Sequence, residues 1–373
     1  MKIFDIGLVG HPFAPIGRGE DLRCTFRALQ KIALDPAVFD LYSIHKPCGE
    51  VQRKLNLRLV SEPCRVNVFH LNGDEIPQAL DHVAKKGFDR SFNIIYPQWE
   101  LSSYPQIWAD NLDRFDEIWA PSQFIFEALK PVVKKPLFGV PVSCEVELSE
   151  ILPRSDFGIS ESAYTFLFFF DFRSYWQRKN PNGVIDAFER ALDLTKNQNI
   201  SLVMKVNGAE LAPEKLMELR RRVQPMGKKV VIIDQTLTDN QIKNLVRCCD
   251  CFISLHRSEG FGRGMSEAMF LAKPVIATRY SGNIDFMRPD NSMLIDYQLI
   301  DVLEGEYPYW EKQHWADADT NQAAKCMQAL VENPAAGQAL GRKAAQTILT
   351  DVGYLSVGLK IQNRLNAIFS TLV

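Results

Sequence analysis

Residues 251–279 are the part of this chain that most restricts its fold, because they join two apolar runs through a glycine-rich loop and a helix-forming stretch. The segment reads CFISLHRSEGFGRGMSEAMFLAKPVIATR. The runs 251–256 and 274–278 are rich in β-branched and aromatic residues, which favours buried strands, and residues 266–272 favour a helix. A strand, a loop, a helix and a second strand form a βαβ unit. The sequence therefore predicts a parallel sheet covered by helices.

The loop of this βαβ unit carries glycines at alternate positions, Gly260, Gly262 and Gly264. A glycine has no Cβ, so the backbone N–H groups of such a loop can come close to a ligand. The helix that follows adds further N–H groups and a partial positive charge at its N-terminus. The loop is therefore suited to a phosphate or pyrophosphate. An ordinary βαβ turn, in which the glycines serve only its tightness, fits the same residues equally well.

Two carboxylates, Glu259 and Glu267, flank the glycine loop. Carboxylates do not bind phosphate, so their expected partners are hydroxyl groups, and the combination suggests a sugar nucleotide; glutamates that simply face water are the alternative. The loop fails the dinucleotide fingerprint G-x-G-x-x-G because Met265 occupies the last position, which disfavours a dehydrogenase. The P-loop motif G-x-x-x-x-G-K-[ST] does not occur in the sequence.

The pattern E-G-F-G-x-x-x-x-E-A-M, followed by K-P-V-I-A-T, resembles the retaining glycosyltransferases of family 4, which have the GT-B fold. The resemblance spans nearly the whole chain and is strongest over residues 166–287. It implies that backbone N–H groups of the loop stabilise a diphosphate and that Glu267 accepts the ribose hydroxyls. It also implies that Glu259 accepts sugar hydroxyls or faces the developing positive charge. The donor-binding residues expected in this segment are Gly260, Phe261, Gly262, Arg263, Gly264 and Glu267.

A basic cluster of Arg173, Arg178 and Lys179 follows the apolar run YTFLFFFDF and precedes the amphipathic stretch PNGVIDAFERAL. By itself this cluster can be a solvated basic turn. Arg173 and Lys179 lie six residues apart, with Lys179 directly before Asn-Pro, which matches the Arg…Lys pair that holds the pyrophosphate in family 4. The resemblance therefore implies that Arg173, Lys179 and Glu259 are catalytic and that Arg178 also binds the donor.

The first apolar run, KIFDIGLVG, leads into a loop that contains Gly17-Arg18-Gly19 ahead of a helical stretch. Loops at the carboxyl ends of parallel strands are where α/β proteins bind ligands. We expect Gly17 and Gly19 to approach the diphosphate, as a glycine loop does at this position in family 4. A plain βα turn fits these residues equally well.

A pattern further along, N-x-x-x-x-x-W-E followed by F-D-x-I-W-A-P-S, resembles a polysaccharide-building subgroup of the same family. Many family 4 enzymes carry a histidine near the position of Trp99 or Glu100 that contacts the donor sugar, and this chain has none there. His70, one strand earlier, can point into the cleft instead, although a histidine near a strand end is more often structural. The acceptor-side candidates are therefore His70, Trp99 and Glu100.

The length of 373 residues favours two domains, each with its own core. We expect an α/β protein of the GT-B fold, with two Rossmann-like domains that face each other across a cleft. Residues 1–155 form the expected acceptor-binding domain and residues 156–350 the expected nucleotide-sugar-binding domain. A C-terminal helix over residues 351–373 is expected to pack on the first domain, and the polar stretch 144–162 is the expected linker.

Composition narrows the class of protein further. Hydrophobic residues make up 46% of the chain and charged residues 24%, as in soluble globular proteins, and the net charge of −2 argues against a general nucleic-acid binder. Among the eight cysteines, Cys248 and Cys251 are spaced as C-x-x-C, but no second ligand cluster completes a zinc site. This favours small apolar residues in a reduced cytosolic protein over a metal site. The N-terminus does not read as a signal peptide, and no apolar run approaches the ~20 residues of a membrane-spanning helix. We expect a cytoplasmic, metal-independent protein, and the lysines of KPVVKKP leave peripheral contact with the inner face of a membrane open.

The predicted function is the retaining transfer of a hexose-type sugar from a nucleoside-diphosphate sugar to a glycan, lipid-linked or surface-polysaccharide acceptor. The donor is a substrate, and no further cofactor is expected. Two alternatives remain: another GT-B enzyme, such as a sugar-nucleotide epimerase or a phosphorylase, and a non-catalytic relative that binds nucleotide sugars. The sequence leaves open the base and sugar of the donor, the acceptor, the linkage and the oligomeric state. It also leaves open whether His70 or Glu100 takes over the role of the missing histidine.

Overall fold

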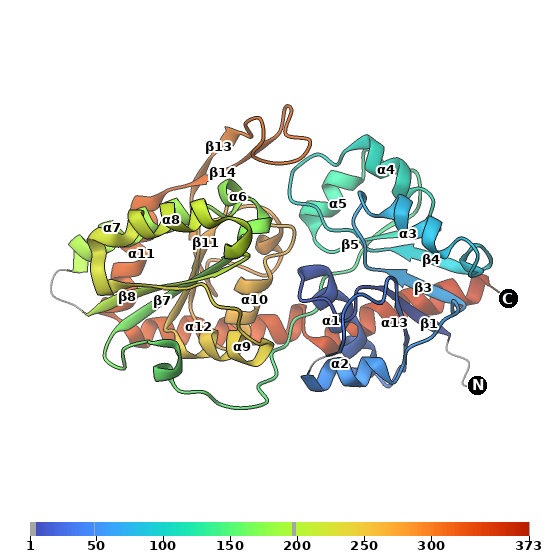
Figure 1. The fold of residues 1–373 in the computed structure, drawn as a ribbon, viewed down its shortest axis with the longest axis horizontal. Helices are drawn as coiled ribbons and strands as arrows, with labels where there is room; N and C mark the ends of the chain where they lie inside the picture. Colours follow the sequence, from blue (N-terminus) through green and yellow to red (C-terminus); the bar gives the residue numbers. More distant parts are fainter. Residues whose placement is uncertain (1–4, 48, 196–198, 373) are drawn as a thin grey trace. The chain divides into compact units, whose positions relative to one another are not determined.

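The computed structural model describes residues 5–47, 49–195 and 199–372, and the chain forms two compact units (Figure 1). Unit 1 comprises Met1–Glu145 and Leu349–Val373, and unit 2 comprises Val146–Ile348. Each unit is built on its own six-stranded parallel sheet with helices packed on it. The α/β architecture expected from the sequence is therefore confirmed.

The sheet of unit 1 has the strand order β2-β1-β3-β4-β5-β6. Strands β1, β3 and β5 are fully buried and read as short apolar runs, as expected for a parallel sheet covered on both faces. The part of the first apolar run before residue 5 lies outside the described residues. In chain order the elements are β1 (Ile6–Gly10), α1 (Gly17–Lys31), β2 (Ala37–Asp40), α2 (Gly49–Asn56), β3 (Val66–Phe69), α3 (Ile76–Val83), η1 (Phe88–Arg90), β4 (Phe92–Ile95), α4 (Gln106–Leu112), β5 (Glu117–Ala120), α5 (Gln123–Leu129) and β6 (Leu137–Gly139).

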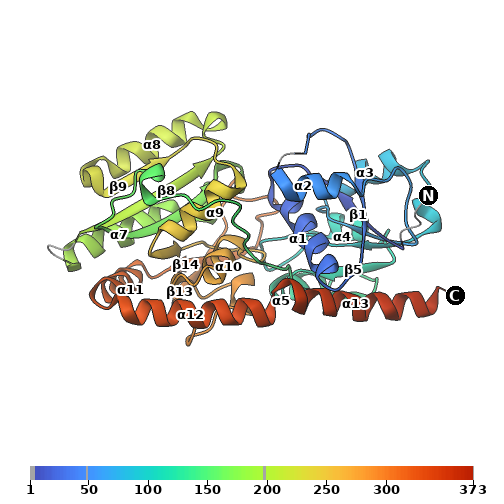
Figure 2. The same ribbon diagram turned by 90° about the horizontal axis from the view of Figure 1, so that it is seen from below.

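Unit 1 is completed by the last helix of the chain, α13 (Tyr354–Thr371), which packs on α1 (Figure 2). Gly358 of α13 lies against the carbonyl oxygen of Ala28, where a Cβ would collide with the backbone of α1. The Arg27 guanidinium donates a hydrogen bond of 2.9 Å to the hydroxyl of Tyr354. The expectation that the C-terminal helix returns to the first domain is therefore confirmed.

The sheet of unit 2 has the order β12-β11-β10-β7-β8-β9, and an antiparallel ribbon, β13–β14, stands beside it. In chain order the elements are η2 (Arg154–Phe157), β7 (Tyr164–Asp171), η3 (Phe172–Ser174), α6 (Trp176–Lys179), α7 (Pro181–Thr195), β8 (Ile200–Asn207), η4 (Ala209–Leu211), α8 (Pro213–Val223), η5 (Gln224–Lys229), β9 (Val230–Ile233), α9 (Asp239–Cys248), β10 (Cys251–Ser254), α10 (Arg263–Phe270), β11 (Val275–Thr278), η6 (Gly282–Asp285), β12 (Met293–Ile295), β13 (Tyr297–Asp301), β14 (His314–Ala318), α11 (Thr320–Glu332) and α12 (Pro334–Asp351).

The core of unit 2 lies between this sheet and the amphipathic helix α7. Phe166, Phe168 and Phe170 alternate along β7 and pack in one buried cluster with Val184 and Phe188 of α7. The order of strands places β7 in the middle of the sheet, with β10 on one side and β8 on the other. The loops after β7, β8 and β10 therefore emerge side by side at the carboxyl edge of the sheet.

Several local signals in the sequence match the observed helix ends. Ser122 accepts a hydrogen bond from the backbone N–H of Ile125 at the start of α5, and Thr238 forms a capping box with Gln241 at the start of α9. Asp319 directly follows strand β14 and caps α11. None of the helices within the described ranges combines the length and the apolar character that crossing a membrane requires.

Candidate active site

The candidate site of unit 2 lies where β7 and β10, neighbours in the sheet, end. The loop after β7 leads into α6, which ends with Arg178 and Lys179, and the loop after β10 leads into α10. This edge of an open α/β sheet is the usual place for a ligand. The two loops that the sequence singled out are therefore adjacent.

Glu259 joins these two loops through charge. Its carboxylate accepts a hydrogen bond from the ammonium of Lys179 and lies 3.4 Å from the guanidinium of Arg178. Burial alone would raise the pKa of Glu259, but Lys179 and Arg178 outweigh burial and lower the pKa to about 2. The carboxylate is therefore ionised at neutral pH.

Arg178 is more deeply buried than the expected donor-binding role suggests. The residue is 4% exposed, and its guanidinium donates a 3.0 Å hydrogen bond to the carbonyl oxygen of Ser258. Its charge also lies beside Glu259. Arg178 therefore links the end of α6 to the loop after β10 through buried contacts. Lys179 occupies the more accessible side of the same carboxylate.

The glycines of the loop have packing roles in the structure. Gly262 precedes α10 with φ of 96°, which favours glycine, and a Cβ on Gly264 would lie 2.7 Å from the ring of Phe169. Phe261 is buried and packs on Phe286 with a ring separation of 5.1 Å, so only its backbone can face a ligand. Arg263 and Glu267, both partly exposed, lie on the first turns of α10.

Arg173 is paired with Asp171 in this structure. Its backbone N–H and its Nε donate to one oxygen of Asp171, at 2.8 and 2.9 Å, and its Nη2 lies 2.5 Å from the other oxygen. The side chain runs over Gly208, at the end of β8, on the opposite side of β7 from β10. The expected meeting of two cations on one diphosphate would therefore require Arg173 to leave Asp171.

In unit 1 the expected glycines differ in their surroundings. Gly17 is exposed and is the first residue of α1. Gly19 is buried, and a Cβ there would lie 2.5 Å from the carbonyl oxygen of Ala14. Close packing of α1 on the preceding loop accounts for Gly19, while Gly17 remains available to a ligand.

The three acceptor-side candidates also differ. Trp99 is 1% exposed and donates from Nε1 to the carbonyl oxygen of Ser103 at 2.9 Å, so the indole belongs to the core of unit 1. Glu100 is partly exposed. His70 is also 1% exposed, neither ring nitrogen has a hydrogen-bond partner among the described residues, and burial lowers its pKa to about 3. A buried imidazole without partners is a candidate for contact with a ligand or for local rearrangement.

Sequence reasoning missed a second polar cluster in unit 1. His11, after β1, is hydrogen-bonded through Nε2 to the carboxylate of Glu75, and the Arg18 guanidinium lies 2.9 Å from the same carboxylate. The ring of Tyr42 lies 5.5 Å from that of His11. These residues follow different strands and are far apart in the sequence, so no local pattern could connect them.

Sequence reasoning also missed Lys205. This lysine lies on β8, next to β7, and the loop after β7 leads to Lys179. Lys205 is fully buried, its ammonium donates to the carbonyl oxygen of Val206 at 2.6 Å, and burial lowers its pKa to about 8. The only sequence signal for a buried lysine at this position was its place within the apolar run SLVMKV.

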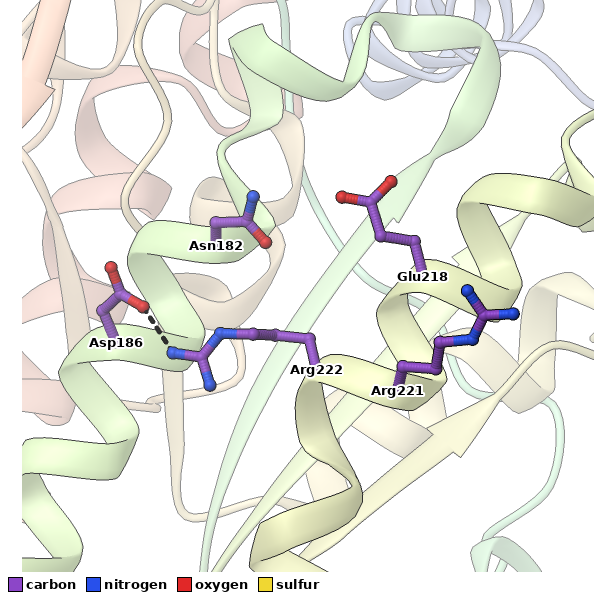
Figure 3. Close-up of a pocket in the computed structure, with 5 residues that line it drawn as sticks. All are labelled: Asn182, Asp186, Glu218, Arg221 and Arg222. Atoms are coloured by element: carbon purple, nitrogen blue, oxygen red, sulfur yellow. Dashed lines mark hydrogen bonds and ion pairs between the residues drawn. The ribbon is translucent and has the colours of Figure 1, made fainter.

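An open groove of 540 Å³ runs between α7 and α8 (Figure 3). It is lined by Asn182, Asp186, Glu218, Arg221 and Arg222. Arg222 pairs with Asp186 at 2.7 Å across the groove. None of the expected site residues lines it. Within the described residues, no three His, Cys, Asp or Glu side chains are grouped so that they could hold a metal ion.

The fold places this chain among known architectures. HepE of Anabaena, in complex with UDP and glucose, has a TM-score of 0.71 with 15% sequence identity, over 97% of this chain and 99% of that chain. Sucrose-phosphate synthase from Thermosynechococcus elongatus has a TM-score of 0.70 with 13% identity, over 99% and 100%. A glycosyltransferase from Rickettsia africae has a TM-score of 0.66 with 11% identity, over 98% of both chains. The fold is therefore GT-B.

The sequence itself carries a more specific similarity. Residues 156–313 match the family model of glycosyl transferases group 1. This stretch contains the basic cluster, Glu259, the glycine loop and Glu267. No curated protein matches the sequence.

Proposed function

We propose that this protein is a retaining glycosyltransferase that moves a hexose-type sugar from a nucleoside-diphosphate sugar to a glycan, lipid-linked or surface-polysaccharide acceptor. The observation that carries the proposal is the contact of Lys179 with Glu259 at the start of the glycine loop that leads into α10. These residues lie within the stretch that matches the glycosyl transferases group 1 model.

In this proposal the second unit binds the donor. The diphosphate would lie at the N-terminus of α10, where the partial positive charge of the helix and its N–H groups favour an anion. Lys179 would contact both Glu259 and the phosphate. Arg173 would leave Asp171 and bind the phosphate instead. Glu267 would accept hydrogen bonds from the ribose hydroxyls. Each charge-assisted hydrogen bond of this kind is worth about 1.5–3 kcal/mol.

The chemical step breaks the bond between the anomeric carbon and the phosphate oxygen and forms a bond from the same face to an acceptor oxygen. The acceptor proton passes to the departing phosphate. Lys179 and the N–H groups of the loop would stabilise the negative charge that develops on the leaving group, and preorganised stabilisation is usually the largest catalytic contribution. Glu259 would face the positive charge on the sugar or accept its hydroxyls.

The acceptor would bind to unit 1, where His70 and the cluster of His11, Arg18 and Glu75 are the candidate contacts. HepE was solved in complex with UDP-glucose, so uridine diphosphate sugars are the first donors to test. We place the reaction in the cytoplasm, with an acceptor that can lie at the inner face of the membrane.

The test is donor turnover by the purified protein, measured as nucleoside diphosphate released from a panel of UDP-, GDP- and ADP-sugars with a mixture of saccharide acceptors. Lys179→Ala should lower turnover by on the order of 10²–10³, because a charge that stabilises the leaving group is lost. The matched control is Lys228→Ala, because Lys228 is an exposed lysine of the same unit. This variant should keep the turnover of the wild type.

The same assay separates the alternatives. Change of the donor sugar without an acceptor would favour an epimerase, and release of a sugar phosphate would favour a phosphorylase. Nucleotide binding in calorimetry without any turnover would favour a non-catalytic relative. Near-normal turnover by Lys179→Ala would remove the proposed role of the Lys179–Glu259 pair.

A further inference from the structure

The short helix α6, which carries both Arg178 and Lys179, has an unfavourable backbone at each end. Tyr175 has φ of 63° and ψ of 112°, and Asn180 has φ of 52° and ψ of 53°. Residues other than glycine adopt positive φ at an energetic cost and keep it only where the surroundings hold them. The position of both cations therefore depends on contacts from outside the turn.

The Asn180 end is held by its own side chain. The amide donates to the carbonyl oxygen of Leu255 at 2.9 Å and accepts from the backbone N–H of Gly183 at 3.1 Å. Asparagine also tolerates this backbone conformation better than most residues. This end is thus fixed to the sheet and to the start of α7.

The Tyr175 end is covered by Tyr307, which lies in the loop between β13 and β14. The two rings are 4.7 Å apart, and Tyr307 is only 7% exposed. The guanidinium of Arg178 lies 6.0 Å from the centre of the Tyr307 ring, within reach of a cation–π interaction. One side chain from the ribbon therefore contacts both the strained residue and one of the two cations.

The β13–β14 ribbon also contacts the loop that carries Glu259, through Arg257. The backbone N–H of Ala316, on β14, donates to the carbonyl oxygen of Arg257 at 2.9 Å. The Arg257 guanidinium pairs with Asp317 at 3.1 Å and lies 5.6 Å from the ring of buried Trp315. Arg257 precedes Glu259 by two residues, so the ribbon reaches the segments on both sides of the Lys179–Glu259 pair (β13, β14 and α6 in Figure 1).

We propose that the β13–β14 ribbon is a brace for Arg178 and Lys179 and that Tyr307 is its positioning residue. Tyr307 acts through Tyr175 and Arg178 and not by contact with the donor. It keeps α6 in the conformation in which Lys179 meets Glu259. The catalytic consequence rests on the proposed function, whereas the effect on the backbone of α6 does not.

Hydrogen exchange tests the brace without any substrate. Tyr307→Ala should speed exchange of the amides at residues 173–180 by about tenfold or more, because the turn opens locally more often. Tyr307→Phe keeps the ring against Tyr175 and Arg178 and should exchange more slowly than Tyr307→Ala. Leu303→Ala, at a 60% exposed position in the same loop, is the control and should leave exchange unchanged.

Turnover gives the second readout, with UDP-glucose as donor and UDP release as the signal. Tyr307→Ala should lower kcat by about tenfold, since misplaced groups stabilise the transition state poorly, and Tyr307→Phe should recover most of the lost kcat. Tyr307→Leu, which keeps apolar bulk, replaces the alanine variant if that variant does not fold.

The two readouts separate the two proposals. Faster exchange at residues 173–180 in a protein that uses no nucleotide sugar would support the brace and reject the proposed function. Normal exchange and normal kcat in folded Tyr307→Ala or Tyr307→Leu would overturn the brace and leave the proposed function standing.

Discussion

At the scale of single residues, Glu259 has the most consequential surroundings in unit 2. Its side chain is 14% exposed and lies between two cations. The same ion pairs that would organise a phosphate site also contribute to stability, because they lower the pKa of this carboxyl from 4.5 to about 2. A lowered carboxyl pKa stabilises the folded state above the ordinary pKa, and this contribution is lost as the pH falls towards the lowered value.

Glu259→Gln should therefore reduce the free energy of unfolding at pH 7 by about 3 kcal/mol, from the size of the pKa shift. Urea denaturation at pH 7 and at pH 3 measures the effect, and the variant should lose less stability between these pH values than the wild type. Glu161→Gln, at an exposed position in the same unit, is the control. An unchanged pH dependence in Glu259→Gln would show that the carboxyl titrates normally.

His70 gives a second prediction about stability and pH, for a base that burial keeps neutral. Burial lowers its pKa from 6.5 to about 3, so below pH 6.5 the unfolded chain takes up a proton that the folded protein excludes. Stability should decline by about 2 kcal/mol between pH 6.5 and pH 5 on this account, and His70→Phe should remove that decline. The measurement is denaturant unfolding at both pH values, with exposed His45→Phe as control. Unaltered sugar transfer by His70→Phe would also exclude His70 as an acceptor contact.

At the scale of elements, the packing of α13 on α1 depends on a glycine. A Cβ at Gly358 would meet the carbonyl oxygen of Ala28, which is backbone and cannot move aside alone. The two helices would have to separate along their line of contact. The hydrogen bond from Arg27 to Tyr354 lies in the same interface and would be lengthened as well.

Gly358→Ala should therefore lower the free energy of unfolding by about 1–3 kcal/mol, as overpacking does. Gly139→Ala is the matched control, because Gly139 has open space around it and an ordinary φ. Denaturant unfolding of both variants measures the difference. Equal stability of the two would mean that α13 adjusts without cost.

Helices and strands could be predicted where short-range sequence patterns determine them. Side-chain contacts between distant residues could not. The alternation of apolar runs with glycine or capping residues predicted β10, α10 and β11, because burial and cap chemistry act within a few residues. The partner of Arg173 was not predictable, since Asp171 and a diphosphate are both suitable for a guanidinium. The pair of His11 and Glu75 joins residues 64 positions apart. Such pairs depend on how the strands are ordered in the sheet.

The β13–β14 ribbon illustrates the same limit. Between residues 291 and 319 the chain forms β13 and β14, and Asp319, directly after β14, caps α11. The strand partners Tyr297 and Ala318 are joined by a loop too long to signal a hairpin. Aromatic residues in that loop gave no indication that one of them would cover Arg178.

At the scale of the whole molecule, Lys179, the glycine loop and Glu267, which are proposed to bind the donor, all belong to unit 2. A nucleoside diphosphate that binds only the folded protein raises its stability by about 2.7 kcal/mol at 100 times its Kd. UDP should therefore raise the Tm, and hydrogen exchange should slow at residues 173–179 and 259–267. Lys179→Ala should show a much smaller shift, and protection confined to unit 1 would contradict the placement of the donor.

The chain order of the two units has a consequence for biosynthesis. Unit 1 consists of Met1–Glu145 together with Leu349–Val373, so the whole of Val146–Ile348 is synthesised between its two parts. When the ribosome has made the first part, the face of α1 that receives α13 has no cover within its own unit. Unit 2 can complete its sheet before that face is closed. A nascent chain stalled when residue 348 has just left the ribosome should therefore hold a protease-resistant second unit and a first unit that is still open to chaperones.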